Sequence, residues 1–107
     1  MRLRVVKCGK LRTRTAFWGP GLRLRGIEEH EYKESIAIEL GSALKCIEMF
    51  ETRRALALKN KVTNRVVFFP IRFIRYRKTY IQMPLWLWEK KRSELEEAGF
   101  ELEFVSQ

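Results

Sequence analysis

Residues 79–99 read TYIQMPLWLWEKKRSELEEAG, and this stretch predicts a strand that passes directly into a helix. Thr79 to Met83 contains residues that favour strands. Pro84 suits a first helical turn because its φ is already helical and its missing N–H has no helical partner there. Leu85 to Ala98 has amphipathic helical spacing, and Gly99 is the residue type that often follows a helix.

Strand patterns lie on both sides of this helix. Phe100 to Val105 alternates Glu with apolar residues, which predicts a final strand. Upstream, Ala55 to Lys59 and Arg65 to Phe69 flank a short polar segment as the two strands of a hairpin would. Ile71 to Tyr76 is predicted to continue as strand. Proline cannot donate to a sheet ladder, so we expect an edge, a bulge or a strand boundary at Pro70.

The N-terminal quarter predicts basic strands around one strong turn. Arg2 to Lys7 is a short basic strand, and Leu11 to Trp18 alternates so that its two arginines share one side of the pleat. Gly19-Pro20-Gly21 is the strongest turn signal in the chain, and Leu22 to Arg25 alternates again. The two halves predict a hairpin with four arginines on one face: Arg12, Arg14, Arg23 and Arg25.

The segment from Glu28 to Arg54 allows two interpretations. Its apolar residues step by four and three positions, which is the spacing of a helical stripe. Alternation between Ser35 and Leu40 also fits a strand, and Gly41-Ser42 could interrupt a helix and cap a new one. We favour a long acidic helix with a possible break at Gly41. The predicted fold is therefore α+β, with an antiparallel or mixed sheet, this long acidic helical segment and a second helix in the C-terminal half.

Charge is sorted into blocks along the chain. Residues 1–25 contain eight Lys or Arg and no acid, whereas residues 28–51 contain seven Glu against two Lys. Residues 53–92 contain twelve basic residues and one acid, and residues 94–103 contain five Glu and no base. The net charge is +9. Solubility alone needs only interspersed charges of both signs, so this segregation predicts faces that attract polyanions.

Size and composition limit the class of protein. A chain of 107 residues fits a single domain over residues 1–107, and a hydrophobic share of 46% excludes a disordered basic tail. No apolar run reaches the roughly 18 residues of a membrane span, and the N-terminus lacks a signal-peptide core, so we expect a cytoplasmic protein without a membrane partner. The chain contains few Asn and Gln residues and many charged residues, which is a tendency of proteins from thermophiles. A small core favours a homo-oligomer, either a dimer or a tetramer.

The sequence offers little for catalysis. His30 is the only histidine, and the absence of Asp excludes a Ser-His-Asp triad, although a Glu could replace the acid. The four Glu within residues 28–34 could bind a hard metal ion, but acids at a helix start also complement the helix dipole. Cys8 and Cys46 have no partner at zinc-ligand spacing, and no phosphate-binding glycine loop is present. We expect no enzymatic activity, no metal and no cofactor.

The densest positive charge coincides with aromatic residues in residues 68–80. Aromatic rings can stack on unpaired bases, at about 1–3 kcal/mol per base, while cations contact phosphates. If one pleat runs through the segment, an apolar set takes one face: Val67, Phe69, Ile71 and Phe73. A basic and aromatic set takes the other, unless Pro70 shifts the register: Phe68, Arg72, Tyr76 and Tyr80. The candidate nucleic-acid-binding residues are Arg12, Arg14, Trp18, Arg23, Arg25, Phe68, Arg72, Phe73, Arg75, Tyr76, Arg77, Lys78, Tyr80 and Trp86.

Some of these candidate nucleic-acid-binding residues could equally well have a purely structural role. Aromatic residues favour strands, and Arg is common on the solvated face of a sheet. Trp86 and Trp88 lie two positions apart, about 200° around a helix, so they cannot share one face, and either could serve the core or a subunit contact. Acidic helices of one subunit could also cover basic strands of another.

Two resemblances favour the nucleic-acid interpretation. Arg77 to Trp88, RKTYIQMPLWLW, resembles the last strand and helix entry of the single-stranded-DNA-binding transcriptional coactivator family, which dimerises through a Pro-started helix containing Trp. The acidic segment before it does not belong to that pattern. In size and layout the whole chain resembles the ThermoDBP-related archaeal proteins. That resemblance implies sequence-independent single-strand binding in grooves between subunits.

The sequence thus predicts a non-enzymatic protein that binds single-stranded nucleic acid, DNA or RNA, without sequence preference. One alternative is a duplex DNA-binding regulator or chromatin protein. The most basic elements are predicted strands, which counts against a recognition helix. The other alternative is a structural assembly subunit whose charge blocks pair between copies.

Overall fold

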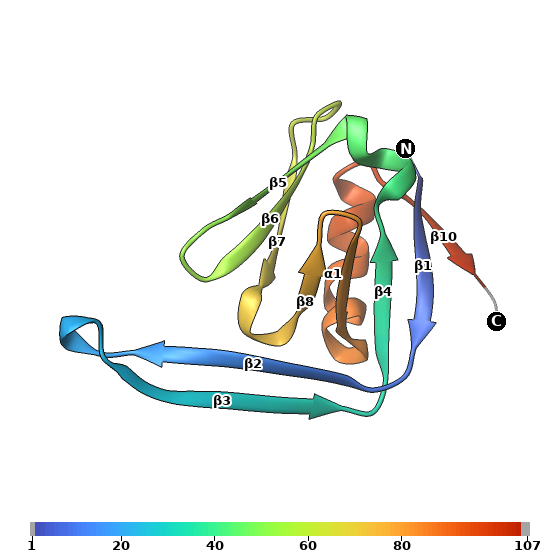
Figure 1. The fold of residues 1–107 in the computed structure, drawn as a ribbon. Coiled ribbons are helices and arrows are strands. Elements are labelled where there is room, and N and C mark those ends of the chain that lie inside the picture. The colour runs from blue at the N-terminus through green and yellow to red at the C-terminus, as the bar shows by residue number, and fades with distance from the viewer. Residues whose placement is uncertain (1, 106–107) are drawn as a thin grey trace.

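The computed structural model describes residues 2–105, apart from the side chain of Phe17. This part of the chain forms three sheets and one α-helix (Figure 1), which confirms the α+β class with a mixed sheet. The strands are β1 (Arg2–Cys8), β2 (Leu11–Trp18), β3 (Leu24–Tyr32), β4 (Ser35–Glu39), β5 (Ile47–Glu51), β6 (Ala55–Asn60), β7 (Val66–Pro70), β8 (Arg75–Arg77), β9 (Tyr80–Pro84) and β10 (Glu101–Val105); the helix is α1 (Leu85–Glu97). Short 3₁₀ turns occupy Pro20–Leu22, Gly41–Cys46 and Ile71–Phe73.

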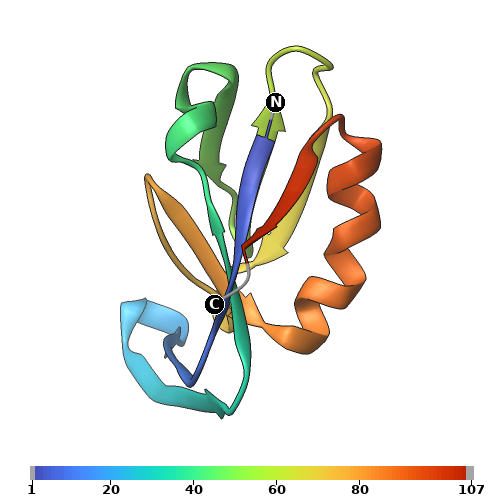
Figure 2. The same cartoon turned by 90° about the vertical axis from the view of Figure 1, so that its right-hand side faces the viewer.

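The largest sheet has five strands in the order β10-β1-β4-β9-β8. Only the β1–β10 pair is parallel, and the other neighbours are antiparallel. Figure 2 shows α1 along one side of this sheet. Leu3, Ile38 and Ile81 are fully buried in the same hydrophobic core as Leu87 and Leu95 of α1. The apolar stripe predicted for this helix is therefore what attaches it to the sheet.

The ends of α1 lie close to the predicted residues, although Pro84 lies just before the first helical turn and not in it. Pro84 ends β9 in an extended conformation and precedes the first helical residue. At the other end Gly99 has φ 95°, which is the left-handed region where glycine has no steric penalty. The Ala98 carbonyl then accepts hydrogen bonds from Asn60 Nδ2 at 2.9 Å and Thr63 Oγ1 at 2.7 Å. The helix is thereby joined to the turn between β6 and β7.

A second sheet has the order β5-β6-β7 and contributes to the same core. The β6–β7 hairpin predicted from its alternating flanks is confirmed. Val67 and Phe69 of β7 are buried with Leu56 and Leu58 of β6, whereas Phe68 is 48% exposed on the opposite face. The face assignment predicted for β7 is therefore correct as far as Pro70.

Strands β2 and β3, which follow β1 and precede β4 in the chain, form a two-stranded arm. The arm projects along one end of the five-stranded sheet (Figure 1). The predicted hairpin and its turn are confirmed, but β3 continues to Tyr32. Arg12 and Arg14 lie opposite Glu31 and Glu29 in the register. Arg23 precedes β3, and Arg25 lies at a register shift, so the four arginines do not form one regular row.

The long acidic helix predicted over residues 28–54 is wrong. This segment contains the second half of β3, then β4, a 3₁₀ turn and β5. The alternative strand at Ser35 to Leu40 is confirmed as β4. This strand is hydrogen-bonded to β1 on one side and β9 on the other, so its backbone partners come from distant parts of the chain. The buried faces of Ile36 and Ile38 match strand alternation, and the helical spacing that continues to Ile47 is coincidental.

The strand predicted for Ile71 to Tyr76 is also wrong in part. A 3₁₀ turn at Ile71–Phe73 separates β7 from β8, so one pleat does not run through the segment. In the β8–β9 hairpin, Tyr76 lies opposite the fully buried Ile81, whereas Arg77 lies opposite Tyr80. Tyr76 and Tyr80 therefore face opposite sides of the sheet.

One further property of the fold concerns α1. No helix in residues 2–105 is long and apolar enough to span a membrane.

Candidate nucleic-acid interface

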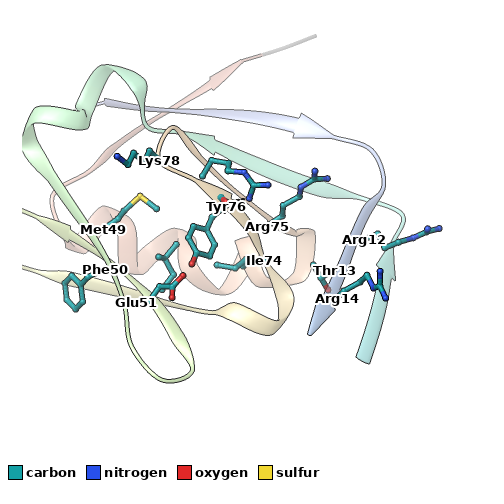
Figure 3. Close-up of a pocket in the computed structure, with 12 residues that line it drawn as sticks. Arg12, Thr13, Arg14, Met49, Phe50, Glu51, Ile74, Arg75, Tyr76 and Lys78 are labelled. Atoms are coloured by element: carbon teal, nitrogen blue, oxygen red, sulfur yellow. Dashed lines mark hydrogen bonds between the residues drawn. The ribbon is translucent and has the colours of Figure 1, made fainter. Parts of the chain in front are cut away.

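A concave surface of about 720 Å³ lies between the arm, β5 and β8 (Figure 3). We call it the central groove. Strands β5 and β8 each end a sheet, so both present an edge with no strand partner among the described residues. The groove is lined by Arg12, Thr13 and Arg14 from the arm, by Met49, Phe50, Glu51 and Leu56 from the second sheet, and by Ile74, Arg75, Tyr76, Arg77 and Lys78.

The floor of the groove is apolar. Leu56 is 1% exposed and Ile74 is 6% exposed, and both belong to the main hydrophobic core. Met49 and Tyr76 are partly buried and pack against that core. Tyr76 is directed to this side because it lies opposite Ile81 in the β8–β9 register. One face of the tyrosine is therefore supported by protein while the ring still lines the groove.

Three of the cations in the groove have no acidic partner. Arg75, Arg77 and Lys78 are exposed, and none of them forms an ion pair within residues 2–105. The guanidinium of Arg77 donates to the backbone carbonyl of Tyr76 at 2.8 Å. These side chains are free to neutralise an anion without first giving up an internal ion pair.

The two arginines of the arm are placed differently. Arg12 lies 3.3 Å from Glu31, and Arg14 lies 2.9 Å from Glu29. All four side chains are more than 45% exposed. Exposed pairs of this kind contribute about 0–1 kcal/mol, so a phosphate could replace the glutamate at little cost.

Thr13 also lies along the groove. Its side chain is 5% exposed, and its hydroxyl has no hydrogen-bond partner in the described residues. Leaving a buried hydroxyl unsatisfied costs roughly 1–3 kcal/mol. The hydroxyl is covered by protein atoms, so it is not presented to a ligand in the groove.

Arg72, Phe73 and Trp86 do not line the groove but hold the arm against the body of the protein. Arg72 Nη2 lies 2.5 Å from Glu28 Oε2 on β3. Phe73 packs edge-on against His30 of the arm at 5.6 Å and against Trp86 of α1 at 5.3 Å between ring centroids. We call these five residues the arm clasp.

The arm clasp changes the proton affinity of its acid. Partial burial would raise the pKa of Glu28, but hydrogen bonds from Arg72 and His30 outweigh it and lower the pKa below its ordinary value of 4.5. The folded protein therefore favours the ionised form of Glu28. On the same face of the arm, burial and the negative charge of Glu28 raise the pKa of Tyr32 above its ordinary value of 10.0.

The remaining predicted residues lie on other surfaces. Trp18 is 63% exposed near the tip of the arm, where Arg23 and Arg25 are also exposed. Phe68 lies on the outer face of the second sheet, and Tyr80 is half-buried on the five-stranded sheet, opposite Arg77. Of the fourteen residues predicted from sequence, the central groove brings together Arg12, Arg14, Arg75, Tyr76, Arg77 and Lys78.

Sequence reasoning missed the contribution of β5. Met49, Phe50 and Glu51 line the groove but were assigned to the long acidic helix. Residues 47–51, IEMFE, do not alternate strictly, because Met49 and Phe50 are adjacent apolar residues, so the local pattern gave only a weak strand signal. Thr13 was also missed, because alternation alone does not show which face of a hairpin will be covered.

Comparisons with known proteins add no further information. No protein-family model, curated protein or solved structure matches this chain. Within residues 2–105, no three His, Cys, Asp or Glu side chains come together in a way that could hold a metal ion.

Proposed function

We propose that this protein binds single-stranded nucleic acid in the central groove, without catalysing a reaction. The observation that carries the proposal is the combination of five basic residues, one acid and an apolar floor with Tyr76 in one concave surface. Cations at the rim would contact phosphates, and unpaired bases would pack on the floor. Phosphate contacts would dominate the affinity, so binding would be largely independent of sequence.

The charge of α1 favours a single strand over a duplex. A helix that reads the major groove needs a basic face along the phosphates. In α1, Lys91 pairs with Glu94 at 3.1 Å and Arg92 pairs with Glu96 at 3.6 Å, so much of its positive charge is neutralised. The groove, in contrast, offers stacking surface that only unpaired bases can use. Binding of duplex DNA remains the alternative that the competition experiment below tests.

We also propose that the protein acts as a homo-oligomer, a dimer or a tetramer, with the arm as the contact. Four large apolar side chains of the arm are exposed: Trp18 (63%), Leu22 (85%), Leu24 (52%) and Ile27 (51%). Clusters of exposed apolar side chains often mark interaction surfaces. A role as an assembly subunit would use the same contact without a nucleic acid.

The test is a binding titration with a fluorescently labelled single strand and an unlabelled duplex competitor. We expect the duplex to compete poorly, and we expect Arg75→Ala with Lys78→Ala to weaken binding. The matched control is Lys45→Ala with Lys61→Ala, which removes the same charge from exposed positions outside the groove. Equal competition by duplex would favour the duplex alternative. Failure to bind any nucleic acid at low salt would favour the assembly subunit.

A further inference from the structure

Glu51 is the only acid among the described residues that line the central groove, and five Lys or Arg side chains line the same groove. It forms no ion pair within residues 2–105. An acid in a groove for a polyanion weakens phosphate binding, so its position calls for another explanation. Specificity often arises from a group that opposes the wrong ligand.

The pleat of β5 decides where Glu51 points. Side chains alternate along a strand, so Glu51 shares a face with Met49 and the buried Ile47. In the β5–β6 ladder Glu51 lies opposite Leu56, which is part of the apolar floor. Figure 3 shows Glu51 on the side of the groove toward which the Tyr76 ring is directed. A carboxylate thus lies at the edge of an apolar surface that has an aromatic ring.

We propose that this part of the groove holds one unpaired base and that Glu51 accepts hydrogen bonds from the N–H groups on its Watson–Crick edge. The proposal rests on the proposed function, since it names the ligand of the same site. The base would pack on the floor beside Tyr76, with its edge toward β5. Arg75, Arg77 and Lys78 would contact the flanking phosphates.

The chemistry of a carboxylate predicts which bases are preferred. An ionised carboxylate only accepts hydrogen bonds, so it favours edges with adjacent donors. Guanine presents N1–H and N2–H₂ side by side and can bind both carboxylate oxygens. Cytosine and adenine each present one amino group. Thymine and uracil present a single N3–H between two oxygens that repel the carboxylate. The ligand is therefore a single strand in which one guanine, or more weakly one cytosine or adenine, occupies the groove.

The size of the preference follows from the strength of such a pair. A good bidentate contact between a side chain and a base discriminates by about 1–3 kcal/mol, which corresponds to roughly 5- to 150-fold in affinity. Exposure of Glu51 places the expected value at the lower end, since water competes for the same oxygens. We expect an oligothymidine with one central guanine to bind about 5-fold more tightly than oligothymidine alone.

The experiment compares two labelled oligonucleotides of about 15 nucleotides, one of thymidine only and one with a single central guanine, a length within the usual site size. Each is titrated with the parent protein, Glu51→Gln and Glu48→Gln. Glu48 lies on the outer face of the same strand and is the matched control. A glutamine both donates and accepts, so Glu51→Gln should bind the two oligonucleotides equally and should bind oligothymidine more tightly than the parent does.

Each outcome has a defined meaning. Loss of the preference in Glu51→Gln and its retention in Glu48→Gln would support the proposal. Equal binding of both oligonucleotides by the parent protein would overturn this inference and leave the proposed function intact. A preference that Glu51→Gln retains would also overturn it. If the parent binds neither oligonucleotide, the proposed function fails and this inference fails with it. Circular dichroism of both variants shows that any change comes from a folded protein.

Discussion

Arg72 and Glu28 are 44 positions apart in the chain, and their side chains approach to 2.5 Å where the arm meets the body of the protein. His30 hydrogen-bonds the other oxygen of Glu28, and its ring contacts Phe73, the neighbour of Arg72. The arm is thus attached by one charged contact and one aromatic contact at the same point. Since Thr13 lies opposite His30 on the arm, the arm clasp also fixes one wall of the central groove.

The first prediction concerns the pH at which the arm stays docked. The pKa of Glu28 is lower in the folded protein than its ordinary value of 4.5, so the contact stabilises the docked arm above that value. This stabilisation is lost as the pH falls through the lowered pKa. We expect NMR resonances of the arm and of Phe73 to shift below about pH 4.5.

Glu28→Gln should remove this pH dependence and loosen the arm at neutral pH. Glu29→Gln is the control, because Glu29 lies on the opposite face of β3 and pairs with the exposed Arg14. If the NMR resonances of the arm show the same pH dependence in both variants, Glu28 is not the group that controls docking of the arm.

The second prediction separates stacking from charge in the central groove. Tyr76→Ala removes a ring but no charge, so it should weaken single-strand binding by about 1–3 kcal/mol with little change in salt dependence. Arg75→Ala and Arg77→Ala should each reduce the slope of log affinity against log salt by about 0.7. The parent slope should be roughly −3 to −4 if four to six cations contact phosphates.

Because Tyr76 packs against the core, its variant must first be shown to be folded by circular dichroism. Folded variants with the affinity of the parent would move the binding site away from the groove, to Trp18 and the exposed arginines of the arm tip.

The third prediction concerns assembly through the arm. Light scattering at micromolar concentration should give a mass of about two or four times the 12.8 kDa of one chain. Trp18→Ser with Ile27→Ser should reduce that mass, because both side chains are more than half exposed on the arm. Val62→Ser is the control, since Val62 is 75% exposed in the turn after β6. A parent protein that is monomeric would contradict the proposed oligomer.

The fourth prediction concerns the contact between the β6–β7 turn and the end of α1. Asn60 is 1% exposed, donates to the Ala98 carbonyl and accepts from the Val62 N–H at 2.9 Å. Asn60→Ala should reduce the free energy of unfolding by roughly 1–3 kcal/mol, because the Val62 N–H loses its acceptor and the Ala98 carbonyl keeps only the hydrogen bond from Thr63. Asn60→Asp keeps the acceptor but removes the donor. Chemical denaturation should therefore distinguish the two variants, and a stability equal to the parent for Asn60→Ala would refute the role of this contact.

Local features of the sequence were sufficient to predict α1 and several strands. Pro84 and Gly99 define the ends of α1 because each acts through its own backbone conformation. The turn at Gly19 to Gly21 and the alternation in β7 likewise depend only on neighbouring residues. These signals identified the arm hairpin, the β6–β7 hairpin, α1 and the final strand.

Two features depended on residues that are distant in the chain. Strand β4 exists because β1 and β9 supply its backbone hydrogen bonds on both sides, and no local pattern shows that such partners are present. The charge available in the groove also depends on distant residues. Arg12 and Arg14 gain acidic partners only when β3 pairs with β2.

By itself, the sequence determined where strong turns and helix ends occur and that the chain carries a large excess of positive charge in blocks. Only the tertiary structure decided that residues 12–14, residues 49–51 with Leu56, and residues 74–78 line one groove, with Glu51 as the single acid among these described residues. The physical reason is that turn and cap preferences act within a few residues. Sheet pairing and burial, in contrast, are decided by partners that folding brings together.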